Sequence, residues 1–439
     1  MGRHPLCFRF RSVLALGRAR AGRLARLAAL GVAIGSLVAQ CDPYWLPGAG
    51  VPGVGGPVNA VATLSNGDII AGGVFAIAGD AACDNIARWN GSSWSALGTG
   101  VTGGGPGAFA AQVAALVTLP NGDLVVGGEF TFAGGVACRH IARWNGSAWT
   151  PLGAGMLGTT GAVALAPTVT ALAVMPNGDV VAGGRFTFAG GVAASGIARW
   201  NGSSWAPLGA GMTSPFAVVR ALTTLPNGDL VAAGSFTTAG GIACNHIARW
   251  DGVAWSALGV GVDDAVEAVV TLANGDVVAG GAFLTAGGLP CRSIARWDGS
   301  TWSPLGSGIT GIAGPDQPGV RALTTLPGGA LVAGGRFDLA GGVPCSGIAS
   351  WSGSTWSALG GGVDGAVSSL APSSTGGLFV GGEFLTAGGA VSNHIARWNG
   401  VAWAAMGTGT FGWLRALATL PNGDLVAGGA LASVGGVPC

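Results

Sequence analysis

One repeated stretch organises the chain. In its second copy it reads Val113-Ala-Ala-Leu-Val-Thr-Leu-Pro-Asn-Gly-Asp-Leu-Val-Val-Gly-Gly-Glu-Phe130 and, after a ten-residue linker, Ile141-Ala-Arg-Trp-Asn-Gly-Ser-Ala-Trp-Thr-Pro-Leu-Gly153. Each complete copy carries two tryptophans five residues apart, and the first lies 23 residues after the turn position held by Asn121. Such fixed spacing indicates tandem structural repeats. The pairs begin at Trp89, Trp144, Trp200, Trp250, Trp297, Trp351 and Trp398.

Each copy holds four short runs typical of β-strands. In the second copy these are residues 113–119, 123–130, 141–144 and 149–153. Asn-Gly joins the first run to the second in most copies, and Asn-Gly or Asp-Gly mostly joins the third to the fourth. These dipeptides adopt the positive φ angles that short hairpins require. A four-stranded antiparallel meander of about 50 residues is a propeller blade. We therefore predict an all-β protein, a β-propeller of four-stranded blades.

The repeat resembles known repeat families. A double glycine, Gly127-Gly128, followed by two spaced aromatic residues is similar to kelch repeats, although the Tyr that precedes the Trp in kelch units is missing. The longer pattern PNGDLVAGGxF…IARWNGSxW resembles repeats of secreted bacterial surface proteins and the extracellular repeats of fungal cortical bud-site markers. This resemblance covers residues 44–439 and implies a binding or scaffold protein with little chemistry of its own.

Both ends of the repeat region contribute to an eighth unit. Leu414 to Gly436 supplies its first two strands, and Tyr44 to Val51 looks like an isolated fourth strand. The N-terminal strand would complete the last blade and remove an open sheet edge. We predict eight blades, the last incomplete because its third strand is missing or because the sequence is truncated. Seven blades plus a tail is the alternative.

The N-terminus differs from the repeats. Residues 1–26 contain seven Arg and no acidic residue, and Leu27 to Ala39 forms an apolar run of thirteen. This run is shorter than the roughly 20 residues of a membrane-spanning helix, and it fits the core of a secretory signal peptide. We predict residues 1–41 as a signal peptide or N-terminal anchor, with lipidation at Cys41 as an alternative, and residues 42–439 as the propeller. The expected location is secreted or cell surface.

Composition limits the function classes. The chain is 49% hydrophobic with a net charge of +1, so it should fold, because disorder requires low hydrophobicity and high net charge. A near-neutral chain also gives no electrostatic argument for binding nucleic acid.

Connections vary in length on one face of the predicted propeller. The Asn-Gly turns are short and uniform, whereas the opposite face carries longer loops at residues 101–112, 156–168, 212–218 and 309–319. Variable loops on a rigid scaffold commonly carry binding function. We assign binding to this long-loop face; loops that act only as spacers are the alternative.

Two positions inside the constant repeat also vary. The first lies seven residues before each turn residue, near the predicted mouth of the central channel, and the second lies between the double glycine and Phe. Changing polar residues around a ring suit recognition of a polar ligand, and neutral drift is the alternative. The candidate ligand-binding residues are Asn59, Arg220, Glu267, Arg321 and Arg415 at the first position and Glu129, Arg185, Arg336 and Glu383 at the second.

Histidine and cysteine recur at fixed repeat positions. His140, His246 and His394 share one position. Zinc needs three or four converging ligands, whereas matching positions on separate blades lie far apart. We expect no metal or cofactor, and buried thiols that pack as small apolar residues in place of disulfides. The cysteines at the second shared position are Cys83, Cys138, Cys244, Cys291, Cys345 and Cys439.

An acidic and a basic residue recur together in most copies. Asp123 follows the turn between the first two strands, and Arg143 lies in the third strand. Because these strands are adjacent, we predict a repeated structural ion pair. The sixth copy loses both partners, with Ala330 and Ser350 in their places.

The residues do not match the active sites of propeller enzymes. A single Tyr and scattered His argue against radical copper oxidases, and the Arg triad and Tyr nucleophile of sialidases have no counterpart. A glycosidase needs paired carboxylates, and Asp263, Asp264 and Glu267 form the only candidate cluster. We predict a monomeric, non-enzymatic module that binds an extracellular protein or glycan. The alternative is a hydrolase or lyase that acts on extracellular glycans.

Overall fold

The computed structural model describes residues 57–439 apart from 79–80, 91–92, 105–109, 159–165, 215, 312–317, 374–376, 406–409, 420–424, 435–436 and 439. All of the described residues belong to one compact unit, Pro43–Cys439. The predicted signal segment and the Tyr44–Val51 strand lie outside the described residues. Within them every regular element is a β-strand, and no helix could cross a membrane.

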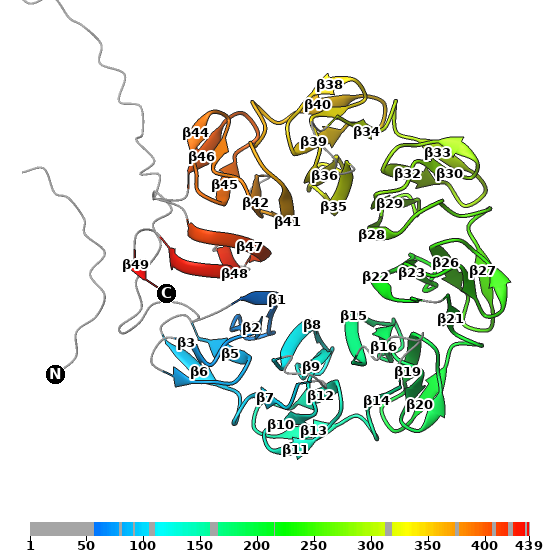
Figure 1. Cartoon of the computed structure of the whole chain (residues 1–439), viewed down its shortest axis with the longest axis vertical. Helices are drawn as coiled ribbons and strands as arrows, with labels where there is room; N and C mark the ends of the chain where they lie inside the picture. Colours follow the sequence, from blue (N-terminus) through cyan, green and yellow to red (C-terminus); the bar gives the residue numbers. More distant parts are fainter. Residues whose placement is uncertain are drawn as a thin grey trace, which may run out of the picture. The chain divides into compact units, whose positions relative to one another are not determined.

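The repeats form blades around a central axis (Figure 1). In the second blade, antiparallel strands lie in the order β13 (Trp149–Pro151), β12 (Ile141–Trp144), β9 (Leu124–Glu129) and β8 (Gln112–Thr118), with β8 innermost. Six other sheets repeat this order. The predicted β-propeller of four-stranded blades is therefore confirmed.

Equivalent strands take the same place in each blade. The other innermost strands are β1 (Val58–Thr63), β15 (Thr168–Val174), β22 (Val219–Thr224), β28 (Val266–Thr271), β35 (Gly319–Thr325), β41 (Val367–Pro372) and β47 (Thr410–Thr419). The other second strands are β2 (Ile69–Gly73), β16 (Val180–Arg185), β23 (Leu230–Gly234), β29 (Val277–Gly281), β36 (Leu331–Arg336), β42 (Leu378–Gly382) and β48 (Leu425–Val434).

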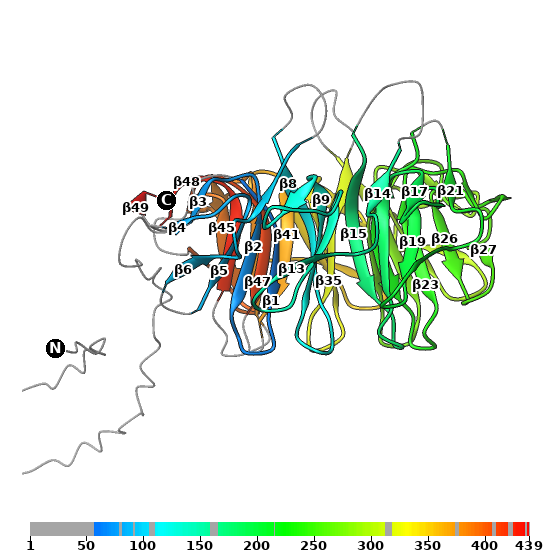
Figure 2. The ribbon, with the colours of Figure 1, turned by 90° about the horizontal axis from the view of Figure 1, so that it is seen from below.

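The outer half of each complete blade is equally regular. The other third strands are β5 (Ile86–Trp89), β19 (Ile197–Trp200), β26 (Ile247–Trp250), β32 (Ile294–Trp297), β39 (Ile348–Trp351) and β45 (Ile395–Trp398). The other fourth strands are β6 (Trp94–Ala96), β20 (Trp205–Pro207), β27 (Trp255–Ala257), β33 (Trp302–Pro304), β40 (Trp356–Ala358) and β46 (Trp403–Ala405). From the side, the tight turns between first and second strands gather at the lower edge (Figure 2).

The eighth unit is a partial blade that closes the ring. Its strands β47 and β48 pair antiparallel, and both contact β1 of the first blade, while β47 also contacts β41 of the seventh. A short strand, β49 (Val437–Pro438), pairs with the end of β48, and among the described residues no counterpart of the third or fourth strand of the other blades joins this sheet. The prediction of eight units with an incomplete last blade is confirmed, and the alternative of seven blades plus a tail is wrong.

Tryptophan pairs join neighbouring blades. Trp144 and Trp149 lie with ring centroids 5.2 Å apart at an angle of 53°. The buried Trp149 donates its indole N–H to the carbonyl of Leu97 in the preceding blade across 2.7 Å. Trp205, Trp255, Trp302, Trp356 and Trp403 make the same bond. In these six blades the second Trp of the pair thus links its own blade to the preceding one.

The connection between the second and third strands, which the repeat pattern leaves as a linker, forms a small hairpin. In the second blade, β10 (Phe132–Ala133) and β11 (Val136–Ala137) pair, and β7 (Val101–Thr102) from the preceding connection adds to β10. The corresponding strands are β3 (Ile77–Ala78), β4 (Ala81–Ala82), β14 (Met156–Leu157), β17 (Phe188–Ala189), β18 (Val192–Ala193), β21 (Met212–Thr213), β24 (Thr238–Ala239), β25 (Ile242–Ala243), β30 (Thr285–Ala286), β31 (Leu289–Pro290), β34 (Ile309–Thr310), β37 (Leu339–Ala340), β38 (Val343–Pro344), β43 (Thr386–Ala387) and β44 (Ala390–Val391).

Candidate functional site

The first variable position is a β-bulge in every blade. Pairing of β8 with β9 joins Val113 to Gly128 and Ala115 to Gly127, which leaves Ala114 as an extra residue. A bulge inserts one residue and re-aims a side chain. The eight bulge residues, which we call the bulge ring, are Asn59, Ala114, Thr170, Arg220, Glu267, Arg321, Ser368 and Arg415.

Packing between blades explains the bulge. A methyl group placed on Gly127 would lie 2.5 Å from Cγ1 of Val169 and 3.5 Å from Cδ1 of Leu172, so both side chains face the same neighbouring blade. Residues three apart in a regular strand point to opposite faces. The extra residue, Thr170, lets both apolar side chains reach the core. The bulge residue is consequently a position that packing leaves free to vary.

Contacts within the bulge ring connect the last blade to the first. Nη1 of Arg415 donates to Oδ1 of Asn59 across 3.1 Å. Nδ2 of Asn59 in turn donates to the carbonyl of Val113 in the second blade across 3.2 Å. Side chains of the bulge ring therefore join the last blade to the first, in addition to the packing of their strands.

Further ring contacts join the third to the fifth blade. Thr170 donates its hydroxyl to the carbonyl of Val219 at 2.5 Å, and Arg220 forms an ion pair with Glu267 at 3.2 Å. In the next blade, Arg321 pairs with Glu383 of the seventh blade at 3.5 Å. The charged side chains of both ion pairs are about 40% exposed. Solvent therefore reaches the charged part of the ring.

The second variable position is less uniform. Glu129 is buried, and one of its oxygens accepts from Nε2 of Gln112 at 3.4 Å. Arg185 donates twice to the carbonyl of Ala166, at 3.2 and 3.0 Å. Arg336 is exposed at the end of β36. Of the nine predicted residues, the structure brings together Arg415 with Asn59, Arg220 with Glu267, and Arg321 with Glu383.

A cavity of about 370 Å³ lies between the innermost strands. Alanine and aliphatic side chains make up much of its wall, and its polar groups come from Thr170, Arg220, Ser369 and Arg415. Three of these four belong to the bulge ring. The cavity is thus a channel lined by aliphatic side chains and by polar groups that include two arginines.

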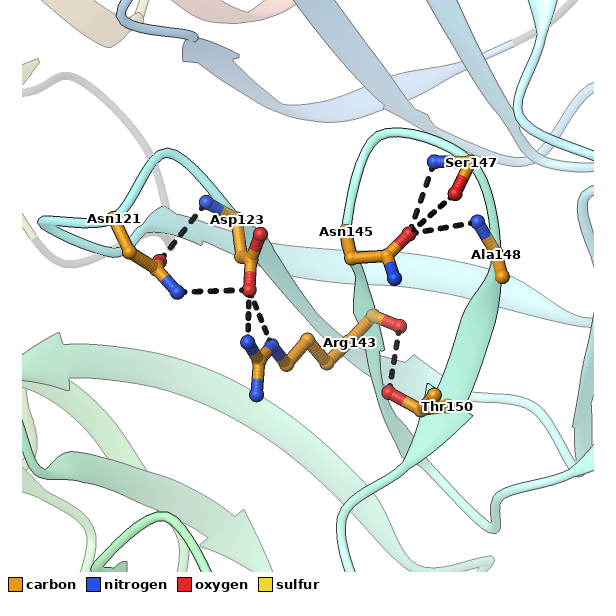
Figure 3. A network of polar contacts seen from close by, with 7 residues as sticks. All are labelled: Asn121, Asp123, Arg143, Asn145, Ser147, Ala148 and Thr150. Atoms are coloured by element: carbon orange, nitrogen blue, oxygen red, sulfur yellow. Dashed lines mark hydrogen bonds and ion pairs between the residues drawn. The ribbon is translucent and has the colours of Figure 1, made fainter.

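The opposite face carries the predicted structural ion pair (Figure 3). Oδ2 of Asp123 accepts from Nε of Arg143 at 2.5 Å and from Nδ2 of Asn121 at 3.0 Å. The Asn121 carboxamide oxygen accepts from the Asp123 amide, which fixes the turn. The prediction is confirmed in five blades: Arg88–Asp68, Arg143–Asp123, Arg199–Asp179, Arg249–Asp229 and Arg296–Asp276.

The three carboxylates considered for glycoside hydrolysis have separate structural partners. Asp263 accepts from the amides of Leu284 and Thr285, and Asp264 accepts from the amide of Ala265. Glu267 pairs with Arg220. Two of the carboxylates thus stabilise loop backbone, and the third belongs to the bulge ring.

The recurring Cys position is buried, and at the recurring His position His140 and His394 are buried while His246 is partly buried. Burial lowers the pKa of His140 to about 4 and raises the pKa of the Cys138 thiol to about 11, so both are neutral near pH 7. In the part of the chain that the structure describes, no three His, Cys, Asp or Glu side chains converge on a metal position. The expectation of buried thiols is confirmed for the free cysteines Cys83, Cys138, Cys244, Cys291 and Cys345.

Comparison with known families gives one match. A family model described as "Domain of unknown function (DUF5122) beta-propeller" matches residues 119–146 and 225–250, which lie in the second and fourth blades. Among curated proteins, none matches the sequence.

Several solved structures resemble the chain at low identity. The extracellular domain of BT4673 from B. thetaiotaomicron is 9% identical with a TM-score of 0.44; the match covers 74% of this chain but only 38% of that domain. A virginiamycin B lyase from Staphylococcus aureus is 12% identical, with 72% and 94% covered and a TM-score of 0.41. The WD40 β-propeller domain of Doa1 is 11% identical, with 88% and 93% covered and a TM-score of 0.43. With the strand order seen here, the chain is a β-propeller repeat protein similar to the matched family model.

Proposed function

We propose that the protein is a non-enzymatic binding module, secreted or displayed at the cell surface, which binds the acidic end of an extracellular glycan at the bulge ring. One observation carries this proposal. In every blade, one of the two variable positions is the residue that a bulge inserts beside the channel. A constant scaffold with variable side chains at one mouth is the arrangement expected of a recognition surface.

The charges of the ring favour an anionic group. Arg220 and Arg415 both line the cavity. Arg415 contacts the neutral carboxamide of Asn59, so an incoming carboxylate meets its guanidinium without displacing an acid from that contact. Guanidinium groups bind carboxylates through paired, charge-assisted hydrogen bonds. Arg415 is therefore the proposed primary contact, with Arg220 and Arg321 as secondary ones.

The polar character of the ring favours a glycan over a protein partner. Strong protein interfaces depend on aromatic and arginine anchors in packed pockets, and the bulge ring contains no aromatic residue. Its amide, hydroxyl, carboxylate and guanidinium groups both donate and accept hydrogen bonds. This mixture suits a ligand with many hydroxyl groups and one acid. The kelch-like repeat and the signal-like N-terminus agree with an extracellular setting.

A glycan array tests the proposal. The full chain is screened against acidic and neutral glycans beside a variant with Arg220→Gln, Arg321→Gln and Arg415→Gln. Val253→Glu is the control, because Val253 is 84% exposed in the turn between β26 and β27, away from the ring. We expect acidic glycans to be captured by the native chain and the control but not by the triple variant. Capture by all three proteins, or by none, contradicts the proposal.

A further inference from the structure

Two kinds of Asn-Gly turn recur in the propeller, and Figure 3 shows one of each. In the turn between the first and second strands, both polar atoms of the Asn121 side chain are bound: Nδ2 donates to Asp123 Oδ2, and Oδ1 accepts from the Asp123 amide. The amide of Gly122 is bound as well, because it donates to the carbonyl of Leu119 at 2.9 Å. The same three bonds recur at Asn66, Asn177, Asn227 and Asn274.

The turn between the third and fourth strands holds its asparagine differently. Oδ1 of Asn145 accepts from the backbone amides of Ser147 and Ala148, at 3.0 and 2.8 Å (Figure 3). Among the described residues, no acceptor binds Nδ2 of Asn145, and no carbonyl accepts from the amide of Gly146. A methyl group placed on Gly146 would meet no atom within 4 Å, so this side of the turn is open. The same arrangement recurs at Asn201 and Asn399.

We propose that Asn145, Asn201 and Asn399 are sites at which the folded protein deamidates without an enzyme. At Asn145, the nitrogen of Gly146 forms a bond to Cγ and passes its proton to water. The bond from Cγ to Nδ2 breaks, and Nδ2 takes up a proton and leaves as ammonia, so that a cyclic succinimide remains. Water then adds to either carbonyl of the ring and opens it, which gives aspartate or isoaspartate. Water is the only reagent that the reaction consumes.

The hydrogen bonds of the Asn145 turn favour each part of this reaction. The attacking nitrogen must lose its proton, and the Gly146 N–H is not held by an acceptor of the described chain. Negative charge develops on Oδ1 as the new bond forms, and two backbone N–H groups already donate to this atom, as donors that stabilise an oxyanion do. In the Asn121 turn, ring closure must instead break the bonds made by Nδ2 and by the Gly122 amide. The fold therefore protects one kind of turn and leaves the other reactive.

Two blades already carry the product at this position. Asp251 and Asp298 replace the asparagine in the fourth and fifth blades, and each accepts from the same two backbone amides of its turn. Hydrogen bonds, the strongest from the Ala254 amide to Asp251 and from the Thr301 amide to Asp298, lower the pKa of both carboxyl groups. Aspartate formed at Asn145 therefore fits its turn as a carboxylate. Each conversion adds one negative charge, so the three together lower the formal net charge of +1 by three.

Peptide mapping by mass spectrometry tests the proposal on the full chain, kept folded in mildly alkaline buffer. We expect Asn145, Asn201 and Asn399 to convert at least about tenfold faster than Asn121 and Asn177, because ring closure at the latter two costs additional hydrogen bonds. Asn145→Asp is the matched variant. It should lack the change at its own position and retain the changes at the other two reactive sites.

The denatured chain is the control for the contribution of the fold. In denaturant all of these sites are solvated Asn-Gly dipeptides, so their rates of conversion should converge. A difference in rate that is present in the native chain and lost in denaturant supports the proposal. Equal rates in the native chain, or faster conversion at Asn121 than at Asn145, overturn it. Conversion of Asn145 only after denaturation also overturns it, because the turn would then protect its asparagine.

Discussion

Arg415 donates a hydrogen bond to the side chain of Asn59 across 3.1 Å, although the two residues are 356 positions apart. One is the bulge residue of the last blade and the other that of the first. The contact shows that the variable ring continues through the junction where the propeller closes. Because the Arg415 side chain is exposed, we assign it a role in binding and little role in stability.

Replacing Arg415 should leave the fold intact. We expect Arg415→Gln to lower the free energy of unfolding by less than about 1 kcal/mol, as exposed polar contacts generally do. The neighbouring Leu414 is fully buried, so Leu414→Ala should cost about 2–5 kcal/mol. Denaturant titration of both variants measures the difference. Equal losses of unfolding free energy in the two variants would mean that Arg415 of the bulge ring stabilises the fold.

The pair Asp123–Arg143 should be energetically coupled. Both groups are held in one network with Asn121, and the Asp123 side chain is largely buried. A double-mutant cycle with Asp123→Ala and Arg143→Ala should give a coupling of about 1 kcal/mol. Additive losses, equal within about 0.3 kcal/mol, would contradict the pairing.

The seventh blade offers an internal control for this cycle. Arg397 occupies the Arg143 position, but Gly377 replaces the aspartate, and the guanidinium lies 5.7 Å from the ring centroid of Phe379. Arg397→Ala should therefore remove the contact with the Phe379 ring. It should not remove an ion pair of the Asp123 type, because Gly377 carries no carboxylate. In a double-mutant cycle that combines Arg397→Ala with Asp123→Ala, which lies in a distant blade, the losses of unfolding free energy should be additive.

Acid should destabilise the protein through its buried histidines. Burial lowers the pKa of His140 to about 4, and it also lowers the pKa of His246 and His394. The unfolded chain binds these protons below pH ~6.5 and the folded chain does not, so the free energy of unfolding falls as pH drops from 6.5 to 4. For His140 alone, the loss is on the order of 3 kcal/mol.

A variant isolates the contribution of His140. His140 has φ of 74°, and Asn85 holds the same position in the first blade with φ of 64°. His140→Asn therefore fits the left-handed backbone and removes the titrating group. Its melting temperature should fall less steeply between pH 6.5 and 4 than that of the native chain. Parallel curves would show that the histidine does not contribute.

The tryptophan links should differ between blades. Trp149→Phe removes the indole N–H and leaves the Leu97 carbonyl without its buried donor, which should cost about 1–3 kcal/mol. Trp94 is only partly buried, and none of the described carbonyls accepts from it in this way, so Trp94→Phe should cost less. Denaturation midpoints compare the two. A larger loss at Trp94 would contradict the role given to these bonds.

Repeat spacing and turn chemistry predict most of the fold. The Asn-Gly turns and the Trp pairs place four strands per copy, because short hairpins constrain strand pairing locally. The small hairpin made by β10 and β11 was missed, although Gly134-Gly135 between its strands is a typical hairpin turn. Each of its strands is only two residues long, too short to show the alternation of apolar and polar residues that marks a strand.

The candidate site was only partly predictable. The variable slot itself stands out in the sequence, but the contacts Arg220–Glu267 and Arg415–Asn59 depend on the spacing of blades around the ring. A sign of the bulge was present: Val169 and Leu172 are both apolar and three residues apart, which conflicts with the two-residue period of a strand. How Arg185 turns to the Ala166 carbonyl could not be predicted, because that loop varies between copies.

Isothermal titration of the full chain with the acidic glycan that binds best on the array tests the central claim most directly. The account predicts that Arg415→Gln weakens binding by about tenfold or more, the loss expected from one charge-assisted contact. Val253→Glu, on the opposite face, should change the affinity by less than about twofold. Unchanged affinity in Arg415→Gln, or an equal loss in both variants, would show that the bulge ring is not the binding site.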